Sequence, residues 1–107
     1  MAPVTEQDWP ALGEATLDTR GAVALARLLG ALADPIRLRL ISILAERGPT
    51  CACDLVGPLE RSQPTISHHT KVLANVGLLR GTKDGRSIWW SADRNRLAIV
   101  IKALGNP

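Results

Sequence analysis

The sequence predicts a mostly α-helical fold with one β-hairpin, built from about five helices and two strands in a single domain. The chain has 107 residues, enough for one modest hydrophobic core. Apolar residues recur at three- and four-residue steps through most of it, whereas Asp84-Gly85 suits a tight turn between two extended stretches. We expect residues 17–107 to form this domain and residues 1–16, which lack sustained periodicity, to form a flexible arm.

The first two helices are indicated by apolar spacing and by residues that start and stop helices. An amphipathic pattern covers residues 17–33. Asp34 is suited to cap a second helix, because its carboxylate can accept from free backbone N–H groups and Pro35 is tolerated in the first turn. Gly48-Pro49 should end that helix.

A short third helix and a longer fourth helix predict a helix-turn-helix. Thr50 is expected to cap a helix over residues 51–56, which Gly57-Pro58 would stop. Ser62 is expected to cap the fourth helix, and Gly77 to terminate it. Two short helices joined by a tight polar turn define the motif.

The segment after the fourth helix reads as a hairpin wing followed by a last helix. With Asp84-Gly85 as the turn, Arg80 lies opposite Trp89 and Leu79 opposite Trp90, which predicts cation–π and apolar cross-strand contacts. Asp93 should cap the last helix. Its apolar stripe is expected either to complete the core or to meet a partner subunit, and consists of Leu97, Val100, Ile101 and Leu104.

Charge is distributed unevenly along the chain, whose net charge is +3. Residues 1–60 hold five Arg and eight acidic residues, a net charge of −3, while residues 61–107 hold eight Lys or Arg and two acidic residues, a net charge of +6. Such asymmetry favours a surface that binds a polyanion, although basic halves also occur on ordinary solvated faces.

Several classes of protein are disfavoured by what the sequence lacks. No apolar stretch approaches the roughly 20 residues that cross a bilayer. The first nine residues lack the basic start and apolar block of a secretory signal, so we expect a cytoplasmic protein without a membrane partner. There is no Gly-rich phosphate loop and no recognisable nucleophile with its base, which argues against an enzyme and against a prosthetic group.

The fourth helix has the residue types of a DNA reader. A helix in the major groove presents small polar side chains to base edges and cations to phosphates. The candidates are Gln63, Thr65, Ser67 and His68 for bases, with Lys71 and, at the hairpin tip, Lys83 and Arg86 for phosphates. A merely solvated helix face is the alternative. His69 is expected to pack or form hydrogen bonds, since adjacent helical residues diverge by about 100° and a shared metal ion with His68 is disfavoured.

The only two cysteines, Cys51 and Cys53, are candidate ligands for a thiophilic ion. On a regular helix, side chains two residues apart diverge by about 200°, so joint capture of one ion is expected to distort the third helix and displace Arg61 and Ser62. The favoured ions are As(III) and Sb(III), ahead of Cd(II) and Pb(II). Packing as two small buried side chains is the alternative.

Four segments form a highly specific combination: Ala31-Leu32-Ala33-Asp34-Pro35-Ile36-Arg37-Leu38, Cys51-Ala52-Cys53-Asp54-Leu55, Ser62-Gln63-Pro64-Thr65-Ile66-Ser67-His68-His69 and Asp84-Gly85-Arg86. With these segments the chain resembles the ArsR/SmtB family of metal-sensing winged-helix repressors over about residues 17–104. The resemblance implies a homodimer that binds an imperfect inverted repeat in double-stranded operator DNA. It also implies that the first and last helices form much of the dimer interface.

The chain departs from the family pattern at several positions. Thr70 stands where the family usually has Leu, and Val56 where arsenite sensors often have a third Cys. The arm offers no thiol, so we expect a site that is either two-coordinate from protein or completed by solvent, an external thiol or a partner subunit. Asp54 is a weak candidate ligand and is favoured instead as a helix-stabilising acid near the positive end of the helix dipole. No His follows His69, which disfavours the family's zinc or nickel site on the last helix.

Three functions follow from these observations. The leading hypothesis is an arsenite-type repressor that releases DNA when an ion binds both cysteines. The second is a repressor that responds to thiol oxidation through the same pair, although an internal disulfide between residues two apart would need strained geometry. The third is a constitutive DNA-binding regulator with structural cysteines.

Overall fold

The computed structural model describes residues 11–13 and 15–105, which form five α-helices, one 3-10 helix and a three-stranded antiparallel sheet. In chain order the elements are α1 (Thr19–Leu32), α2 (Pro35–Arg47), β1 (Thr50–Cys51), η2 (Ala52–Asp54), α3 (Val56–Leu59), α4 (Gln63–Asn75), β2 (Leu79–Asp84), β3 (Ser87–Ala92) and α5 (Arg94–Ala103). The predicted mostly helical fold with a hairpin wing is confirmed, with one strand more than expected.

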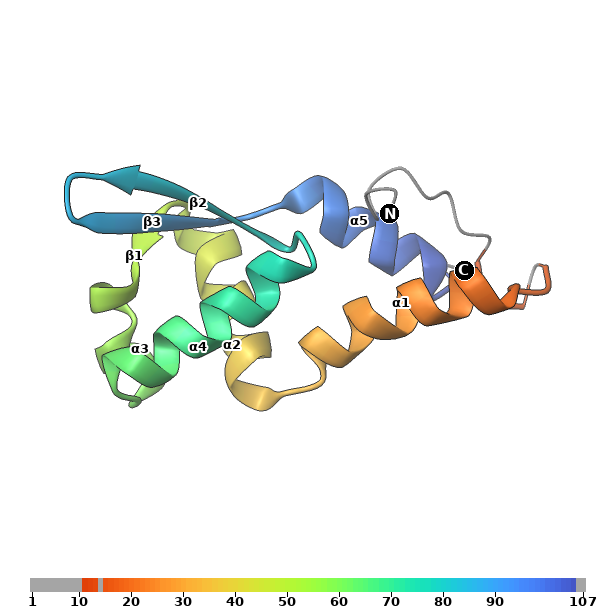
Figure 1. Ribbon diagram of the computed structural model, residues 1–107, viewed down its shortest axis with the longest axis horizontal. Helices are drawn as coiled ribbons and strands as arrows, with labels where there is room; N and C mark the ends of the chain where they lie inside the picture. The colour runs from red at the N-terminus through yellow and green to blue at the C-terminus, as the bar shows by residue number, and fades with distance from the viewer. Residues whose placement is uncertain (1–10, 14, 106–107) are drawn as a thin grey trace.

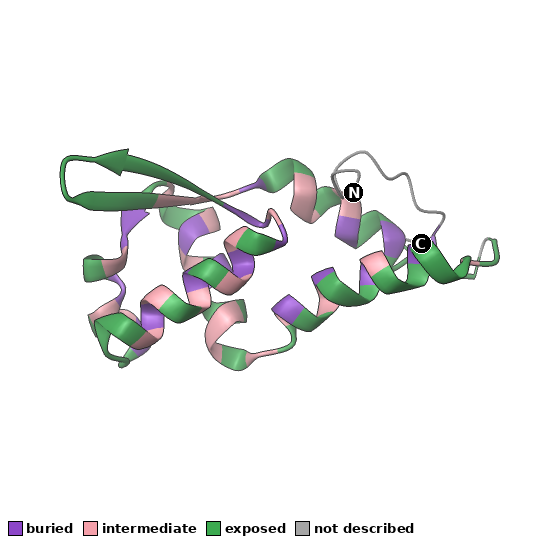
Figure 2. Cartoon of the chain, in the orientation of Figure 1, coloured by how far each residue is buried: buried purple, intermediate pink, exposed green. Residues whose placement is uncertain are grey.

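The molecule is elongated, with extents of 44 × 25 × 20 Å, and its elements fall into two groups (Figure 1). Helices α1 and α5 lie beside each other at one end, while α2, α3, α4 and the sheet occupy the other. Buried residues of α1, α2, α4 and α5 belong to one hydrophobic core, and each of these helices also carries exposed residues (Figure 2). The core is aliphatic and includes Leu28, Leu40, Leu44, Leu55, Leu59, Ile66, Leu73 and Leu78, all at most 1% exposed.

Each of the four long helices, α1, α2, α4 and α5, begins with a cap in which a side-chain oxygen accepts a hydrogen bond from a backbone N–H. Asp34 and Asp93 each accept at 3.0 Å, from Arg37 and Arg96 respectively. Ser62 accepts from the backbone of α4 at 3.4 Å. Asp18, which was not predicted as a cap, starts α1. The capping predictions for α2, α4 and α5 are therefore confirmed.

The predicted third helix is wrong in position. Thr50 and Cys51 form strand β1, which pairs with Trp90 and Trp89 of β3, so Thr50 does not cap a helix. The 3-10 helix η2 and then α3 follow, and α3 contains the Gly57-Pro58 pair that was expected to end it. Proline is compatible with the first turn of a helix, where its missing N–H has no partner to lose. Pairing with the wing provides backbone hydrogen bonds to a segment too short to be stable as an isolated helix.

The hairpin register also differs from the prediction. Gly81 lies opposite Trp90 and Thr82 opposite Trp89, so the central turn residues are Gly85 and Arg86 rather than Asp84-Gly85. Gly85 has φ 63°, and a glycine with positive φ at the first central position is typical of a type II′ turn. A Cβ on Gly81 would lie 2.9 Å from the Trp90 ring, so this register places a large ring over a residue without a side chain. The predicted contact between Arg80 and Trp89 is absent from this register.

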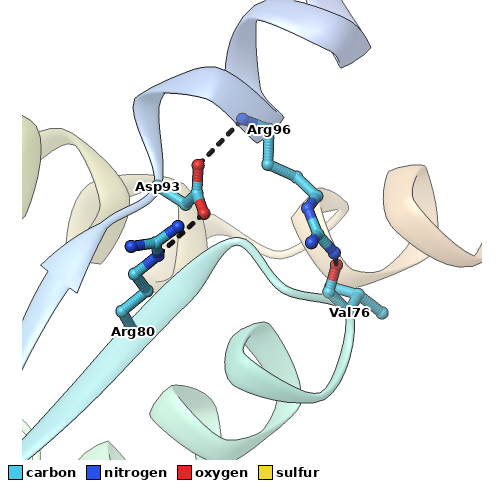
Figure 3. Close-up of polar contacts among 4 residues, drawn as sticks. All are labelled: Val76, Arg80, Asp93 and Arg96. Carbon is cyan, nitrogen blue, oxygen red and sulfur yellow. Dashed lines mark hydrogen bonds and ion pairs between the residues drawn. The ribbon is translucent and has the colours of Figure 1, made fainter. Parts of the chain in front are cut away.

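Instead, Arg80 joins the base of the wing to the start of α5 (Figure 3). Its Nε donates to Asp93 at 3.1 Å, while the second carboxylate oxygen of Asp93 accepts from the backbone N–H of Arg96. The guanidinium of Arg96 donates in turn to the carbonyl of Val76, between α4 and β2, at 3.1 Å. These contacts fix the wing relative to both α4 and α5.

The last helix divides its apolar stripe between the core and the surface. Val100 is buried, whereas Ile101 is 60% and Leu104 49% exposed. Near the N-terminus, Ala11 is buried and the N–H of Leu12 donates to the carbonyl of Ala103, so this part of the expected arm packs against α5. Residues 1–10 of that arm lie outside the described residues. None of the helices in the described part of the chain is long and apolar enough to span a bilayer.

Candidate thiol and nucleic-acid site

Cys51 and Cys53 form a disulfide at the junction between strand β1 and the 3-10 helix η2, with Cα atoms 5.3 Å apart. Cys51 is buried and Cys53 is exposed. The backbone N–H of Cys53 lies 3.1 Å from the sulfur of Cys51 and donates to it. The expectation that the two side chains diverge by about 200° is wrong here, because extended and 3-10 backbone replaces the regular helix on which it was based.

The donor set at this junction suits a soft ion once the disulfide is reduced to two thiols. The sulfurs of Cys51 and Cys53 and a carboxylate oxygen of Asp54 all lie within 4.8 Å of one another. Two thiolates are the ligands that thiophilic ions prefer, and Asp54 is exposed and free to approach. Joint capture of an ion therefore does not require a helical turn to unwind first.

The cysteines and the predicted DNA reader share one open pocket of about 210 Å³. Helix α4 contributes three of the predicted contact residues to its wall, and the turn of the wing contributes a fourth. The lining consists of Cys51, Ala52, Cys53, Gln63, Ser67, Thr70, Lys71, Arg86, Ser87, Ile88 and Trp90. A molecule in this pocket would contact the thiol pair, α4 and the wing at once.

The other three predicted DNA contacts lie outside this pocket. The Thr65 hydroxyl is 3.0 Å from that of Ser62, beside the start of α4. His68 is exposed on α4. Lys83 lines a separate hollow of about 390 Å³ beside Trp89. Four of the seven candidates are thus brought together with the cysteines, and three are not.

His69 packs toward α2, as predicted. The guanidinium of Arg37 lies 3.2 Å from its Nδ1 and also donates to the carbonyl of Ala31 at 2.6 Å. Burial lowers the pKa of His69 below its usual 6.5, which favours the neutral ring that can accept from Arg37. The ring centroid of His68 lies 5.5 Å away, and the two histidines belong to no cluster of metal-ligand type within the described residues.

Two features of the pocket were not predicted from the sequence. Ile88 and Trp90 form an apolar wall, which depends on the observed register of β3. Thr70 is only 1% exposed, and its hydroxyl donates to the carbonyl of Ser67 at 2.9 Å. Thr70, which stands where the family usually has Leu, therefore satisfies its buried hydroxyl with a hydrogen bond inside α4. The spacing of Gln63, Ser67 and Lys71 at four-residue steps was the available signal that they share a face.

Helices α3 and α4 with the wing of β2 and β3 define a winged helix-turn-helix, the architecture of a DNA-binding transcriptional regulator. The sequence profile described as "Bacterial regulatory protein, arsR family" matches residues 34–80. The chain belongs to the ArsR family of bacterial transcriptional regulators, and the relatives described below are regulators rather than enzymes.

Individual relatives cover most of the chain. An arsenical resistance operon repressor from Staphylococcus aureus is 38% identical over 80 residues, which make up 75% of this chain and 76% of that protein. The transcriptional regulator NmtR from Mycobacterium tuberculosis is 40% identical over 87 residues, 81% of this chain and 72% of that protein. The structure of an ArsR-like regulator from Rhodococcus sp. RHA1 is 29% identical and superposes with a TM-score of 0.69, covering 78% of this chain and 77% of that one.

Proposed function

We propose that the protein is a metalloid-responsive transcriptional repressor that binds operator DNA and releases it when a thiophilic ion binds Cys51 and Cys53. As(III) and Sb(III) are the favoured inducers, ahead of Cd(II) and Pb(II), because two soft sulfur donors match their chemistry. The observation that carries the proposal is the pocket shared by both cysteines, the reader face of α4 and the wing turn. The arsenical resistance repressor among the relatives supports it.

DNA binding is assigned to α4 and the wing. Gln63, Thr65, Ser67 and His68 would face base edges in the major groove. Lys71 on α4 and Lys83 and Arg86 on the wing would bind phosphates, and all three are exposed. The basic second half of the chain supplies the matching charge for this polyanion. A repressor of operator DNA would act in the cytoplasm.

The repressor is proposed to act as a homodimer through α1 and α5. Large apolar side chains are exposed on this side of the chain, among them Val23 at 58% and Ile101 at 60%. Leu12, which donates through its backbone to Ala103 of α5, and Leu104, at the end of α5, are each 49% exposed as well. Burying such side chains against a second copy is favourable by about 25 cal/mol for each Å² of apolar area. Two copies would present two α4 helices to an inverted repeat.

Coupling between the thiols and DNA would run through backbone contacts. Cys51 is paired with Trp89 of the wing strand β3, so a change at this sulfur acts on the strand that positions Arg86. Residues of η2 pack against α4. An ion held by both sulfurs would therefore disturb the wing and helix α4 together. This route replaces the unwinding of a regular third helix expected from the sequence.

Titration of a fluorescently labelled operator would test the proposal. Reduced protein should lose operator affinity on addition of arsenite, measured by anisotropy. Cys51→Ser and Cys53→Ser should each abolish this response while still binding DNA. Ala52→Ser is the matched control, because it adds the same hydroxyl between the two cysteines and removes no sulfur. Retention of full affinity by protein with arsenic demonstrably bound would refute the proposal and favour a constitutive regulator.

A second candidate function, a repressor that responds to thiol oxidation, is favoured by the Cys51–Cys53 disulfide. Disulfides that form in reducing compartments are usually transient and often sense redox state. Oxidised and reduced protein without any metalloid would then differ in operator affinity. Equal affinities of the two forms would exclude this candidate and leave the metalloid response untouched.

A further inference from the structure

We propose that the pocket beside the Cys51–Cys53 disulfide is a docking site for a small anionic thiol, which exchanges with the disulfide at Cys53. The product is a mixed disulfide between Cys53 and the small thiol. This inference does not depend on whether a metalloid binds the reduced cysteines. Three observations support it: the different exposure of the two cysteine residues, the hydrogen bond to the sulfur of Cys51, and the charge of the pocket wall.

The exposure of the two residues selects the sulfur that is attacked. Both cysteines line the open pocket, but Cys51 is only 6% exposed, whereas Cys53 is exposed. Thiol–disulfide exchange requires a thiolate to reach one sulfur along the S–S bond, so access decides the site. Attack is therefore expected at the sulfur of Cys53, with Cys51 as the leaving group.

The leaving sulfur is the one already stabilised by the backbone. The N–H of Cys53 donates to the sulfur of Cys51 at 3.1 Å. A hydrogen bond to a charged acceptor is stronger than one to a neutral acceptor, so the bond favours the thiolate that leaves. When a thiolate attacks the sulfur of Cys53, negative charge develops on the sulfur of Cys51. That sulfur already accepts a hydrogen bond from the N–H of Cys53.

The exchange balances without any additional reagent. The thiolate RS⁻ forms a bond to the sulfur of Cys53, the S–S bond breaks, and its electron pair remains on Cys51 as a thiolate. Attack of a second thiolate on the mixed disulfide releases RSSR and leaves both cysteines reduced. The small thiol is oxidised to RSSR and the protein disulfide is reduced. The first step increases the protein mass by one whole thiol molecule.

The pocket wall selects for negative charge on the thiol. Lys71 and Arg86 both line the pocket and are exposed, and none of its lining residues is acidic. Gln63 and Ser67 add uncharged hydrogen-bonding groups. Asp54, next to the sulfurs but not part of the wall, is the nearby acidic group. A carboxylate on the small thiol can thus pair with either cation while its sulfur lies at Cys53.

The adduct would also interfere with DNA reading, a consequence that rests on the proposed function. A group attached to Cys53 occupies space bounded by Gln63, Ser67 and Lys71. These are residues to which DNA contacts are assigned. The mixed disulfide is therefore expected to bind operator more weakly than the unmodified protein.

Reduction kinetics test the docking site without DNA. The oxidised protein would be treated with mercaptosuccinate, which carries two carboxylates, and with uncharged 2-mercaptoethanol. Each rate would be divided by that thiol's rate with 2-hydroxyethyl disulfide, which removes differences in intrinsic reactivity. We expect mercaptosuccinate to be favoured by about tenfold at low salt, about threefold for each exposed cation, and this preference to fall as salt is added.

Matched variants identify the cations. Lys71→Gln and Arg86→Gln should each reduce the preference by about threefold. Lys83→Gln makes the same charge change on the wing but outside this pocket, and should leave the preference unaltered. Circular dichroism would confirm that each variant is folded. Equal normalised rates for the two thiols, or an equal loss in Lys83→Gln, would overturn the docking site.

Peptide mapping after an acid quench locates the adduct. The added thiol is expected on Cys53, and an adduct confined to Cys51 would contradict the assignment. Failure of the two cysteines to form a disulfide under aerobic oxidation would overturn this inference while leaving metalloid binding intact. Conversely, if arsenite leaves operator affinity unchanged while the exchange kinetics are as expected, only the proposed metalloid function would be refuted.

Discussion

Replacement of Asp93 should separate two contributions to stability at the base of the wing. One carboxylate oxygen accepts from the N–H of Arg96 at 3.0 Å and caps α5, while the other accepts from Arg80 at 3.1 Å. Loss of a helix cap costs about 1 kcal/mol. The pair with Arg80 contributes less, about 0.5 kcal/mol, since the Arg80 side chain is 75% exposed and screened by water.

The two effects can be measured separately by urea unfolding at neutral pH. Asp93→Ala removes both and should lower the free energy of unfolding by about 1.5 kcal/mol, the sum of the two contributions. Asp93→Asn keeps a capping oxygen and loses the charge, so it should cost about 0.5 kcal/mol. Arg80→Ala should cost as much as Asp93→Asn, and combining these two should add little. Equal losses in the Ala and Asn variants would refute the assignment of most of the energy to the cap.

The pH dependence of these variants follows from the pKa of Asp93. The backbone hydrogen bond from Arg96, followed by the hydrogen bond from Arg80, lowers this pKa below its usual 3.8. A lowered pKa means that the stabilisation is fully present above pH 3.8 and is lost as the pH falls through the folded-state value. The stability difference between the wild type and Asp93→Asn should therefore vanish in acid. A difference that stays constant down to the acid limit would contradict the pKa assignment.

Other substitutions test the core, the wing turn and the buried histidine. Leu28→Ala, at a side chain with no exposure, should lower the free energy of unfolding by about 2–5 kcal/mol in urea titrations. Gly85→Ala should cost about 1 kcal/mol, because φ is 63° at this turn; an unchanged midpoint would contradict the turn geometry. Because the pKa of His69 is lowered, the wild type should lose stability relative to His69→Gln as the pH falls through 6.5, measured from urea midpoints in a pH series.

Local patterns in the sequence were sufficient for the long helices and their starts. Asp34, Ser62 and Asp93 cap the helices they were expected to cap, because a cap depends on residues only a few positions apart. The helix-turn-helix and the existence of the hairpin followed from the same short-range signals. The family was identified correctly from four motifs, two of which include the starts of helices α2 and α4.

The features that were not predicted depend on contacts between distant segments. Strand β1 has two residues and exists because β3, some forty positions later, supplies its hydrogen-bonding partners. The register of the wing brings the Trp90 ring over Gly81 and departs from the preference of Asp-Gly for the central turn positions. Both errors affect the site, since they determine how the cysteines are presented and which residues of β3 face the pocket.

The pairing of Cys51 with Trp89 has a consequence for engineering and for divergence within such regulators. The segment that carries the two cysteines cannot be exchanged independently of the rest of the fold, because Cys51 also belongs to the sheet that holds the wing. A transplanted segment would have to preserve the extended backbone at Thr50 and Cys51, or the wing would lose its neighbouring strand. Residues after Cys51 can therefore be changed with less effect on the wing than the whole segment can.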